Sequence, residues 1–234
     1  TCVQPYNGKM YMSYHTRGDG HGACIEVFKT ENDKTTMLQY LEDKKNVLDF
    51  NHLMIDTKPS TPQLYVVGSS NDSGAMLARI DINNDGLLNT DVREIDENTS
   101  INPLTVVPLI RNVQKGSADA KNDENCIVRD GDKLLVMSTR GYEVYDPETL
   151  NSLGSKTQPG KAKHITMNGT EMATLYYTSR PNSVDAEVAG KVELFNTGAD
   201  ILNATPSKTI DIEGIAPNNG KNTIAIDGNY IYVC

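Results

Sequence analysis

The sequence contains no tryptophan and only three phenylalanines, so any aromatic surface that stacks a sugar ring must use its 11 tyrosines. No apolar run approaches the roughly 20 residues that a membrane-spanning helix needs, so no transmembrane segment is predicted. Basic residues do not balance the acidic ones, 22 against 31, and the net charge is -9. Because an acidic surface repels a phosphate backbone, nucleic acids are excluded as partners.

Cysteines are few, and their spacing does not indicate a metal site. Cys2, Cys24, Cys126 and Cys234 form no CxxC pair and no zinc-finger pattern. Each lies in or beside a predicted strand, so buried thiols are expected. A disulfide between Cys2 and Cys234 is the alternative if the protein is exported to an oxidising compartment.

Known catalytic motifs are also absent from the sequence. There is no nucleophile elbow, no P-loop, no HExxH and no G-x-G-x-x-G after a predicted strand. Acidic residues are plentiful, but the sequence alone does not place two of them across a cleft. These absences favour a binding protein over an enzyme.

A repeated hairpin is the strongest positive signal. Residues Asn222–Cys234 repeat the pattern of Asn125–Met137, with five of the thirteen aligned positions identical. Each copy reads as a strand, an Asp-Gly turn and a second strand. Asp-Gly between apolar runs predicts a tight hairpin in which both turn residues adopt positive φ.

The hairpin belongs to a longer repeat of four strands. Five residues are assigned the same place in it, namely Tyr11, Tyr65, Leu135, Tyr176 and Tyr232, with gaps of 54, 70, 41 and 56 residues. The fourth, weakest strands are expected at Met37–Leu41, Val92–Ile95, near Leu153 and at Lys208–Ile212. The long second gap is assigned to a loop insertion at Glu97–Asp123. No helical periodicity appears.

Four strands in every 40–50 residues, approximately, predict a β-propeller of four-stranded antiparallel blades, in the all-β class. We expect a single domain over residues 1–234, with blades at about 3–49, 52–115, 124–162 and 163–215 and an incomplete blade at 222–234. These make about 4.5 blades. Because a ring leaves no exposed strand edge, the half-blade leads us to expect a longer chain of six to eight blades.

The repeat strings carry a family resemblance. Asn-x-Ile-Ala-Ile-Asp-Gly-x-Tyr-Ile-Tyr-Val at the C-terminus and Gly141–Asp146 resemble the repeats of bacterial YVTN/lactonase-type propellers, and the chain is similar to propeller lipoproteins of Bacteroidetes. The resemblance implies a protein of the periplasm or cell surface, with a lipid anchor in the full-length protein as one form of that expectation. It implies little about activity, since propellers carry many functions.

One loop has the residue spacing of a calcium site. Its oxygen ligands would be the side chains of Asp81, Asn83, Asp85 and Asn89 and the main-chain carbonyl of Leu87. The spacing resembles the DxDxDG loops of integrin-type propellers, but Val92 stands where an EF-hand has its bidentate glutamate. The alternative is a polar turn, because turns and calcium sites use the same residue types.

A second candidate site lies where the innermost strand of each blade begins. The repeat places Asn51, Asn125, Lys163 and Asn222 at equivalent positions, beside His52, Cys126, His164 and Thr223. Polar residues repeated at one position converge on the axis of a propeller and create a ligand site at the mouth of its channel. The alternative is structural, with asparagine side chains bonding to the main chain.

From these patterns we expect a non-catalytic propeller that binds a small molecule, a glycan or a protein at the channel mouth through Asn51, His52, Asn125, Lys163, His164 and Asn222. Lys163 would favour an anionic group. The alternative is a lactonase-type hydrolase acting on a small lactone, with His52 and His164 as general bases. Calcium is the only expected cofactor, and the sequence leaves the oligomeric state open.

Overall fold

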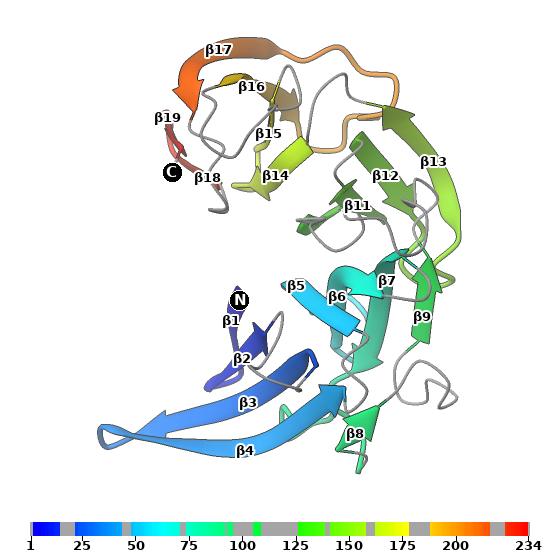
Figure 1. Ribbon diagram of the computed structural model, residues 1–234, viewed down its shortest axis with the longest axis vertical. Coiled ribbons are helices and arrows are strands. Elements are labelled where there is room, and N and C mark those ends of the chain that lie inside the picture. Colours follow the sequence, from blue (N-terminus) through cyan, green and yellow to red (C-terminus); the bar gives the residue numbers. More distant parts are fainter. Residues whose placement is uncertain are drawn as a thin grey trace. The chain divides into compact units, whose positions relative to one another are not determined.

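The computed structural model describes residues 2–14, 22–43, 48–70, 74–91, 93–95, 105–108, 126–138, 141–157, 162–177, 188–215 and 223–233. Within these ranges the chain forms 19 strands and no helix (Figure 1). Consecutive strands pair in antiparallel order within five sheets. The expected all-β class and the four-stranded propeller blades are therefore confirmed. None of the described segments is a helix long and apolar enough to cross a bilayer.

The chain divides into two compact units, Thr1–Asp123 (unit 1) and Glu124–Cys234 (unit 2). Unit 1 holds one sheet in the order β1-β2-β3-β4-β8 and a second in the order β5-β6-β7-β9. The strands of unit 1 are β1 (Cys2–Tyr6), β2 (Lys9–Tyr14), β3 (Cys24–Glu31), β4 (Lys34–Asp43), β5 (Leu48–Asp56), β6 (Gln63–Ser70), β7 (Gly74–Asp81), β8 (Glu94–Ile95) and β9 (Thr105–Pro108).

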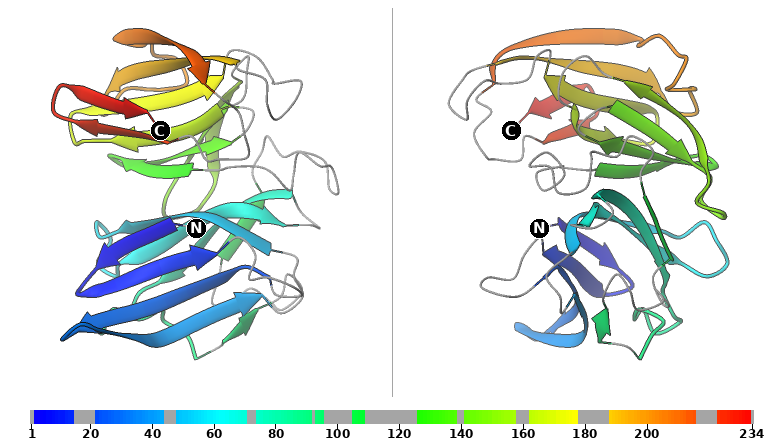
Figure 2. Two further views of the ribbon diagram at one scale, coloured as in Figure 1. Left: turned by 60° about the vertical axis from the view of Figure 1, so that its left-hand side comes forward. Right: turned by 45° about the vertical axis from the view of Figure 1, so that its right-hand side comes forward.

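Unit 2 holds two four-stranded sheets, β10-β11-β12-β13 and β14-β15-β16-β17, and the hairpin β18-β19. The strands of unit 2 are β10 (Cys126–Asp130), β11 (Lys133–Ser138), β12 (Gly141–Tyr145), β13 (Ser152–Thr157), β14 (Ala162–Met167), β15 (Glu171–Tyr177), β16 (Val188–Asn196), β17 (Lys208–Ile215), β18 (Ile224–Asp227) and β19 (Tyr230–Val233). Figure 2 shows this last hairpin beside β14 and β15, where buried Ile224 belongs to one hydrophobic cluster with Leu175 and Val192.

The short hairpin turns follow the sequence prediction with one change. Asn7 and Gly8 between β1 and β2 both have positive φ, 48° and 69°. In the Asp-Gly copies only Gly131 (58°) and Gly228 (55°) do. Asp130 and Asp227 are instead the last paired residues of their strands. The expectation that both Asp-Gly residues adopt positive φ is therefore wrong, because the two-residue loop starts at the glycine.

The fourth strand of the second sheet also differs from the prediction. Within Val92–Ile95 only β8 forms, and it pairs in parallel with Glu42 and Asp43 of the first sheet. The second sheet is completed by β9, which lies inside the segment predicted to be a loop and pairs with Met76–Arg79. A two-residue strand and a strand within a polar segment carry no periodicity from which pairing can be read.

The strand register corrects one repeat assignment. Tyr65 of β6 pairs with Met54, four residues after Phe50. Four residues after Ala162 in β14 stands Thr166, and its partner is Ala173 rather than Tyr176. Tyr176 pairs with Ala162 and occupies the place that Gly68 has opposite Phe50. The match between Leu-Tyr strings was misleading, because turn length and pairing set the register.

Tyrosines fill much of both cores, in keeping with the lack of other large aromatic residues. Tyr11, Tyr65, Tyr142, Tyr145 and Tyr177 are among the largest fully buried side chains. A buried hydroxyl needs a partner. The Tyr11 hydroxyl donates to the carbonyl of Gly86 at 2.6 Å, and the Tyr65 hydroxyl donates to Gln63 Oε1 at 2.8 Å.

The cysteines agree with the expectation of buried thiols where the structure describes them. Cys24 and Cys126 are buried and Cys2 is half-buried, and none of these three forms a disulfide within the described residues. Cys234 lies outside those residues, so the Cys2–Cys234 alternative stays a prediction.

Candidate functional site

A β-bulge places the polar residue of the inner strand in each unit. In β5 the pairing register shifts between Phe50 and His52, which leaves Asn51 as the extra residue. In β14 it shifts between Ala162 and His164, which leaves Lys163. A bulge adds one residue to a strand and redirects its side chain. Asn51 and Lys163, predicted to be equivalent from the sequence, therefore share an unusual backbone feature.

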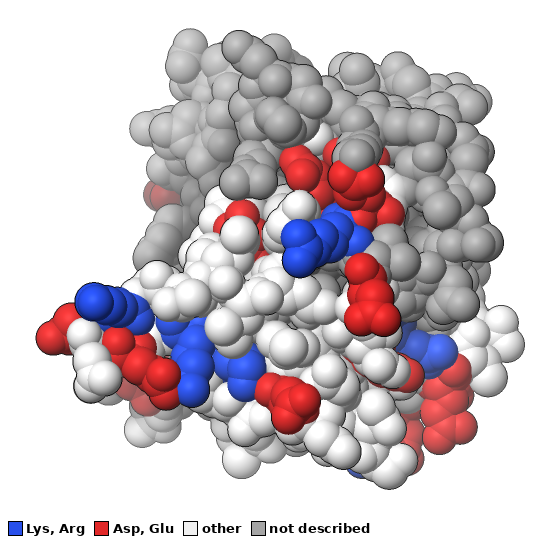
Figure 3. All heavy atoms as spheres, turned by 90° about the horizontal axis from the view of Figure 1, so that it is seen from below, with Lys and Arg blue, Asp and Glu red and all other residues white. Residues whose placement is uncertain are grey.

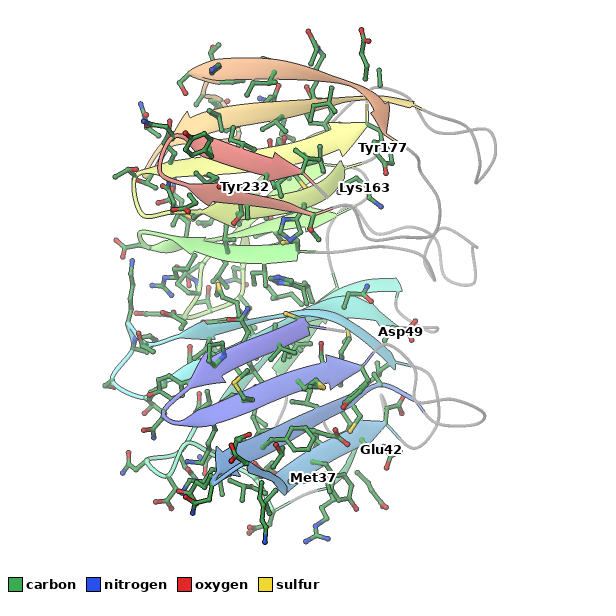
Figure 4. The ribbon with its side chains drawn as sticks, turned by 90° about the vertical axis from the view of Figure 1, so that its left-hand side faces the viewer. Met37, Glu42, Asp49, Lys163, Tyr177 and Tyr232 are labelled. Carbon is green, nitrogen blue, oxygen red and sulfur yellow. The ribbon has the colours of Figure 1, made fainter. Side chains whose placement is uncertain are left out.

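Lys163 has the most distinctive surroundings of the predicted site residues. It is 5% exposed, and its Nζ lies 5.4 Å from the centroid of the Tyr177 ring. An ammonium over an aromatic face is stabilised by the ring quadrupole, and more strongly when it is partly desolvated. Figure 4 shows Lys163 and Tyr177 at the same end of their sheet, away from the end where Tyr232 lies. The arrangement holds a positive charge at the end of the inner strand.

The next residue, His164, is oriented by the neighbouring hairpin. The main-chain N–H of Ile224 donates to its Nδ1 at 3.5 Å. A neutral imidazole that accepts at Nδ1 carries its proton on Nε2, so Nε2 is a hydrogen-bond donor. Cys126 donates its Sγ–H to the carbonyl of Ile165 at 3.2 Å, and within unit 2 a ring nitrogen of His164 lies within 4.8 Å of that sulfur.

In unit 1 the bulge depends on a glycine in the facing strand. Asn51 is 7% exposed and His52 is half-buried. A Cβ on Gly68 would stand 1.8 Å from the main-chain oxygen of Asp49. The backbone of β5 thus approaches β6 more closely than any side chain permits, and Gly68 makes the bulge possible.

The six predicted ligand residues are not all seen together. Asn51 and His52 belong to unit 1, while Lys163 and His164 belong to unit 2. Asn125 and Asn222 lie outside the described residues. The geometry therefore supports two local pairs, each consisting of a bulged polar residue followed by a histidine.

The predicted calcium loop is closed by its own hydrogen bonds. Asn83 Oδ1 accepts the N–H groups of Asp85 and Leu87, each at 3.0 Å. The Leu87 carbonyl accepts the N–H of Asn83 at 2.8 Å. Asp81 Oδ1 accepts from Gln63 Nε2 at 3.1 Å, and the Asp81 carbonyl accepts from Asn89 at 2.8 Å.

These bonds bear on how well the loop fits a cation. A calcium ion needs six to eight oxygens that converge on it. Two of the five predicted ligand oxygens, those of Asn83 and Leu87, are turned toward loop N–H groups. Calcium binding would require that loop to exchange these bonds for the ion. A site at Asp81, Asn83, Asp85, Leu87 and Asn89 stays a prediction.

Sequence reasoning missed a group of polar side chains in unit 2. The Tyr142 hydroxyl lies 2.8 Å from Thr174 Oγ1 and 3.3 Å from Glu193 Oε2, and the Tyr176 hydroxyl donates to Glu193 Oε1 at 3.0 Å. Burial raises the pKa of Tyr176, and the hydrogen bond to Glu193 raises it further. Tyr177 was missed as a site residue as well, although it directly follows Tyr176, one of the five residues aligned across the repeats.

Comparisons with known proteins assign the chain to no family. No family model matches the chain, and no curated protein matches its sequence. Among solved structures it is similar to an exo-1,5-alpha-L-arabinanase from a bovine ruminal metagenomic library, with 9% identity and a TM-score of 0.47, covering 99% of this chain and 85% of that one. It is also similar to a subtype N10 neuraminidase-like protein of A/little yellow-shouldered bat/Guatemala/060/2010, with 9% identity and a TM-score of 0.46, covering 88% of this chain and 64% of that one. A third similar structure is BamB from Moraxella catarrhalis, with 8% identity and a TM-score of 0.31, covering 99% of this chain and 89% of that one.

Proposed function

We propose that the chain is a non-catalytic binding propeller, in which the bulged residue Lys163 of unit 2 contacts the ligand. Asn51 holds the corresponding position in unit 1. The observation that carries this proposal is Lys163. A buried ammonium at a β-bulge, set against the Tyr177 ring, is a fixed positive charge in a desolvated place. Such a charge interacts more strongly with an anion than an exposed lysine would. The favoured ligand is therefore a small molecule or glycan with a carboxylate or phosphate group.

The orientation of His164 supports binding rather than catalysis. A general base must present an unprotonated nitrogen to the proton that it removes. The bond from Ile224 occupies Nδ1 and leaves the proton on Nε2. In that tautomer His164 donates a hydrogen bond to a ligand oxygen. A lactonase-type hydrolase with His52 and His164 as bases is the competing proposal.

The proposal extends the repeat resemblance to bacterial YVTN-type propellers of the periplasm or cell surface, of the kind found in Bacteroidetes lipoproteins. Support for this placement comes from the repeat strings alone. Fractionation of cells that express the full-length gene tests it, and a protein found only in the cytosol would contradict it.

Thermal shift measurements with a panel of small anions test the binding role. The panel contains phosphate, glucuronate, galacturonate and succinate. A ligand that binds only the folded protein raises its melting temperature. We expect at least one anion to stabilise the wild type and the control Lys208→Met, which removes an exposed charge on β17, but not Lys163→Met. Methionine is an unbranched side chain of similar length that lacks the charge.

A shift that persists in Lys163→Met, or a panel without any effect on the wild type, would contradict the anion site. Hydrolysis of a small lactone is measured in parallel. Turnover that disappears in His52→Ala or His164→Ala would establish the hydrolase instead.

A further inference from the structure

The outer edge of β4 in unit 1 is only partly covered. At one end of β4, β8 pairs with Glu42 and Asp43, and the N–H of Glu42 donates to the carbonyl of Arg93 at 2.8 Å. Residues Tyr40 and Glu42 lie in a regular stretch of the β3–β4 ladder, so the N–H and C=O of Tyr40 point to the same outer edge. No described segment pairs with that edge beyond Glu42.

A glutamine holds the next chain segment away from this edge. Gln39 Nε2 donates to the carbonyls of Leu88 and Thr90, each at 3.0 Å, and its Oε1 accepts the N–H of Leu88 at 2.8 Å. The side chain thus stands between β4 and the segment before β8. What remains is a groove of about 550 Å³, lined by Met37–Tyr40, Asn83, Leu87–Asp91 and Arg93.

The groove is lined by one cationic side chain, Arg93, and by the exposed apolar side chains of Met37 and Leu38. The Arg93 guanidinium lies over the Tyr40 ring, 5.6 Å from its centroid, and within the described residues it forms no ion pair. Met37 and Leu38 are 47% and 41% exposed. Leu38 is the extra residue where the β3–β4 register shifts. Asp91 also lines the groove and repels an acidic group of a ligand. Such a group is therefore favoured only where it contacts Arg93.

The surrounding face mixes both signs of charge. Figure 3, seen from the side on which β4 and β8 lie in Figure 1, shows basic side chains singly among acidic ones. The described residues of this face therefore form no broad positive patch that would attract acidic ligands. Selectivity for an acidic group therefore depends on the local contact with Arg93.

We propose that this groove binds an extended peptide by strand addition to the free edge of β4. The chain itself uses the same edge in this way, since β8 adds to it over two residues. Main-chain bonds to Tyr40 would continue that pairing toward Met37. The peptide would place a carboxylate side chain on Arg93 and an apolar side chain on Met37 and Leu38. This inference is independent of the anion site in unit 2.

Fluorescence anisotropy with a labelled peptide tests the proposal. The probe alternates threonine and valine and carries one central glutamate. We expect saturable binding that weakens about fivefold in Arg93→Gln, the effect of losing an exposed ion pair. The control Lys29→Gln removes a β3 cation that does not line the groove, and it should leave binding unchanged. A peptide with proline beside the glutamate should not bind, because it lacks a main-chain N–H.

Three results would overturn the proposal. They are equal binding of a peptide with lysine in place of glutamate, full binding to Arg93→Gln, and no binding of the glutamate peptide to the wild type. Sedimentation of the wild type gives a fourth. A dimer that dissociates in Arg93→Gln but not in Lys29→Gln would identify a second copy of the chain as the occupant of the groove.

Discussion

The two inner-strand bulges, one in each unit, solve the same packing problem with opposite residues. In unit 1 the residue before the bulge is large and its partner is small, Phe50 opposite Gly68. In unit 2 the residue before the bulge is small and its partner is large, Ala162 opposite Tyr176. Phe50 and Tyr176 are both almost fully buried. The repeat therefore specifies the combined volume of the pair, and either strand can supply it.

This exchange predicts that the two units respond to different substitutions. Close approach of the backbones in unit 1 leaves no room at Gly68, whereas in unit 2 the hydroxyl of Tyr176 reaches Glu193. In unit 1 the position that tolerates no larger side chain is Gly68 on β6. In unit 2 the corresponding position on β15 is Tyr176, which is held by a hydrogen bond to Glu193.

The largest effect is expected for Gly68→Ala. The new Cβ would meet the main-chain oxygen of Asp49, which cannot rotate away as a side chain would. We expect a loss of at least about 3 kcal/mol in the free energy of unfolding, measured by urea titration. Gly8→Ala is the control, because its Cβ meets no atom within 4 Å and only its positive φ is strained. It should cost about 1 kcal/mol. Equal losses of unfolding free energy in both variants would show that the backbone of β5 moves to accommodate the new Cβ.

A smaller loss of unfolding free energy is expected from substitution of Asp130, the last residue of the inner strand β10. Asp56 in unit 1 accepts the N–H of nearby Lys58, whereas Asp130 in unit 2 accepts the N–H of Gly198 through both carboxylate oxygens, at 2.9 and 2.7 Å. Removing this buried acceptor in Asp130→Ala should cost about 1–3 kcal/mol by the same titration. The exposed neighbour Asp132→Ala should stay within about 0.5 kcal/mol. Similar values for the two variants would remove the contact between sheets as a source of stability.

If the loop after β7 binds calcium, the ion stabilises the protein through a site in unit 1. At a calcium concentration five times Kd, the folded protein should gain about 1 kcal/mol, seen as a higher melting temperature than in chelator. Asp85→Ala in unit 1 should abolish that difference. Asp200→Ala in a unit 2 turn should keep it, although loss of the Asn203 contact lowers stability in both conditions. Identical melting of the wild type with calcium and with chelator would exclude the site.

The last effect is absent at neutral pH and appears only at alkaline pH. Burial, with a smaller contribution from Tyr6, raises the pKa of Tyr11 to about 12. The folded state then keeps a proton that the unfolded chain loses near pH 10, so stability falls between about pH 10 and 12. Tyr176, whose pKa is raised by burial and by Glu193, loses stability in the same direction and over a wider range. Melting from pH 8 to 12 should show a shallower decline in Tyr11→Phe and in Tyr176→Phe than in the wild type. A parallel decline in all three would contradict these shifts.

The fold was predictable because strand alternation and turn residues are local signals. The hairpins at Asp130-Gly131 and Asp227-Gly228 follow directly from them. Pairing between segments distant in the sequence has no corresponding local signal. The attachment of β8 to β4 depends on two main-chain pairs and not on side-chain pattern. The alignment of Tyr176 with Tyr65 failed for the same reason, since register is a property of the pair.

The candidate sites were predictable only in part. Repeat alignment identified Asn51 and Lys163 as equivalent, and the shared bulge agrees with that assignment. It did not find Tyr177, because a ring beneath an ammonium depends on where two neighbouring strands end. The groove along β4 was invisible to it, since no pattern in the sequence shows that a glutamine side chain will hold a later segment away from an edge.

The order of strands in unit 1 has a consequence for synthesis on the ribosome. The chain leaves the first sheet after β4, builds three strands of the second, returns to the first as β8 and then completes the second with β9. The first sheet is not finished until β8 has emerged, about fifty positions after β4 ends at Asp43. The second is not finished until β9 has emerged, about 25 positions after β7 ends at Asp81. A nascent chain that ends before Glu94 therefore holds two incomplete sheets with open edges, and such edges are prone to pair with other chains. The two sheets of unit 1 must mature together, one closing strand after the other.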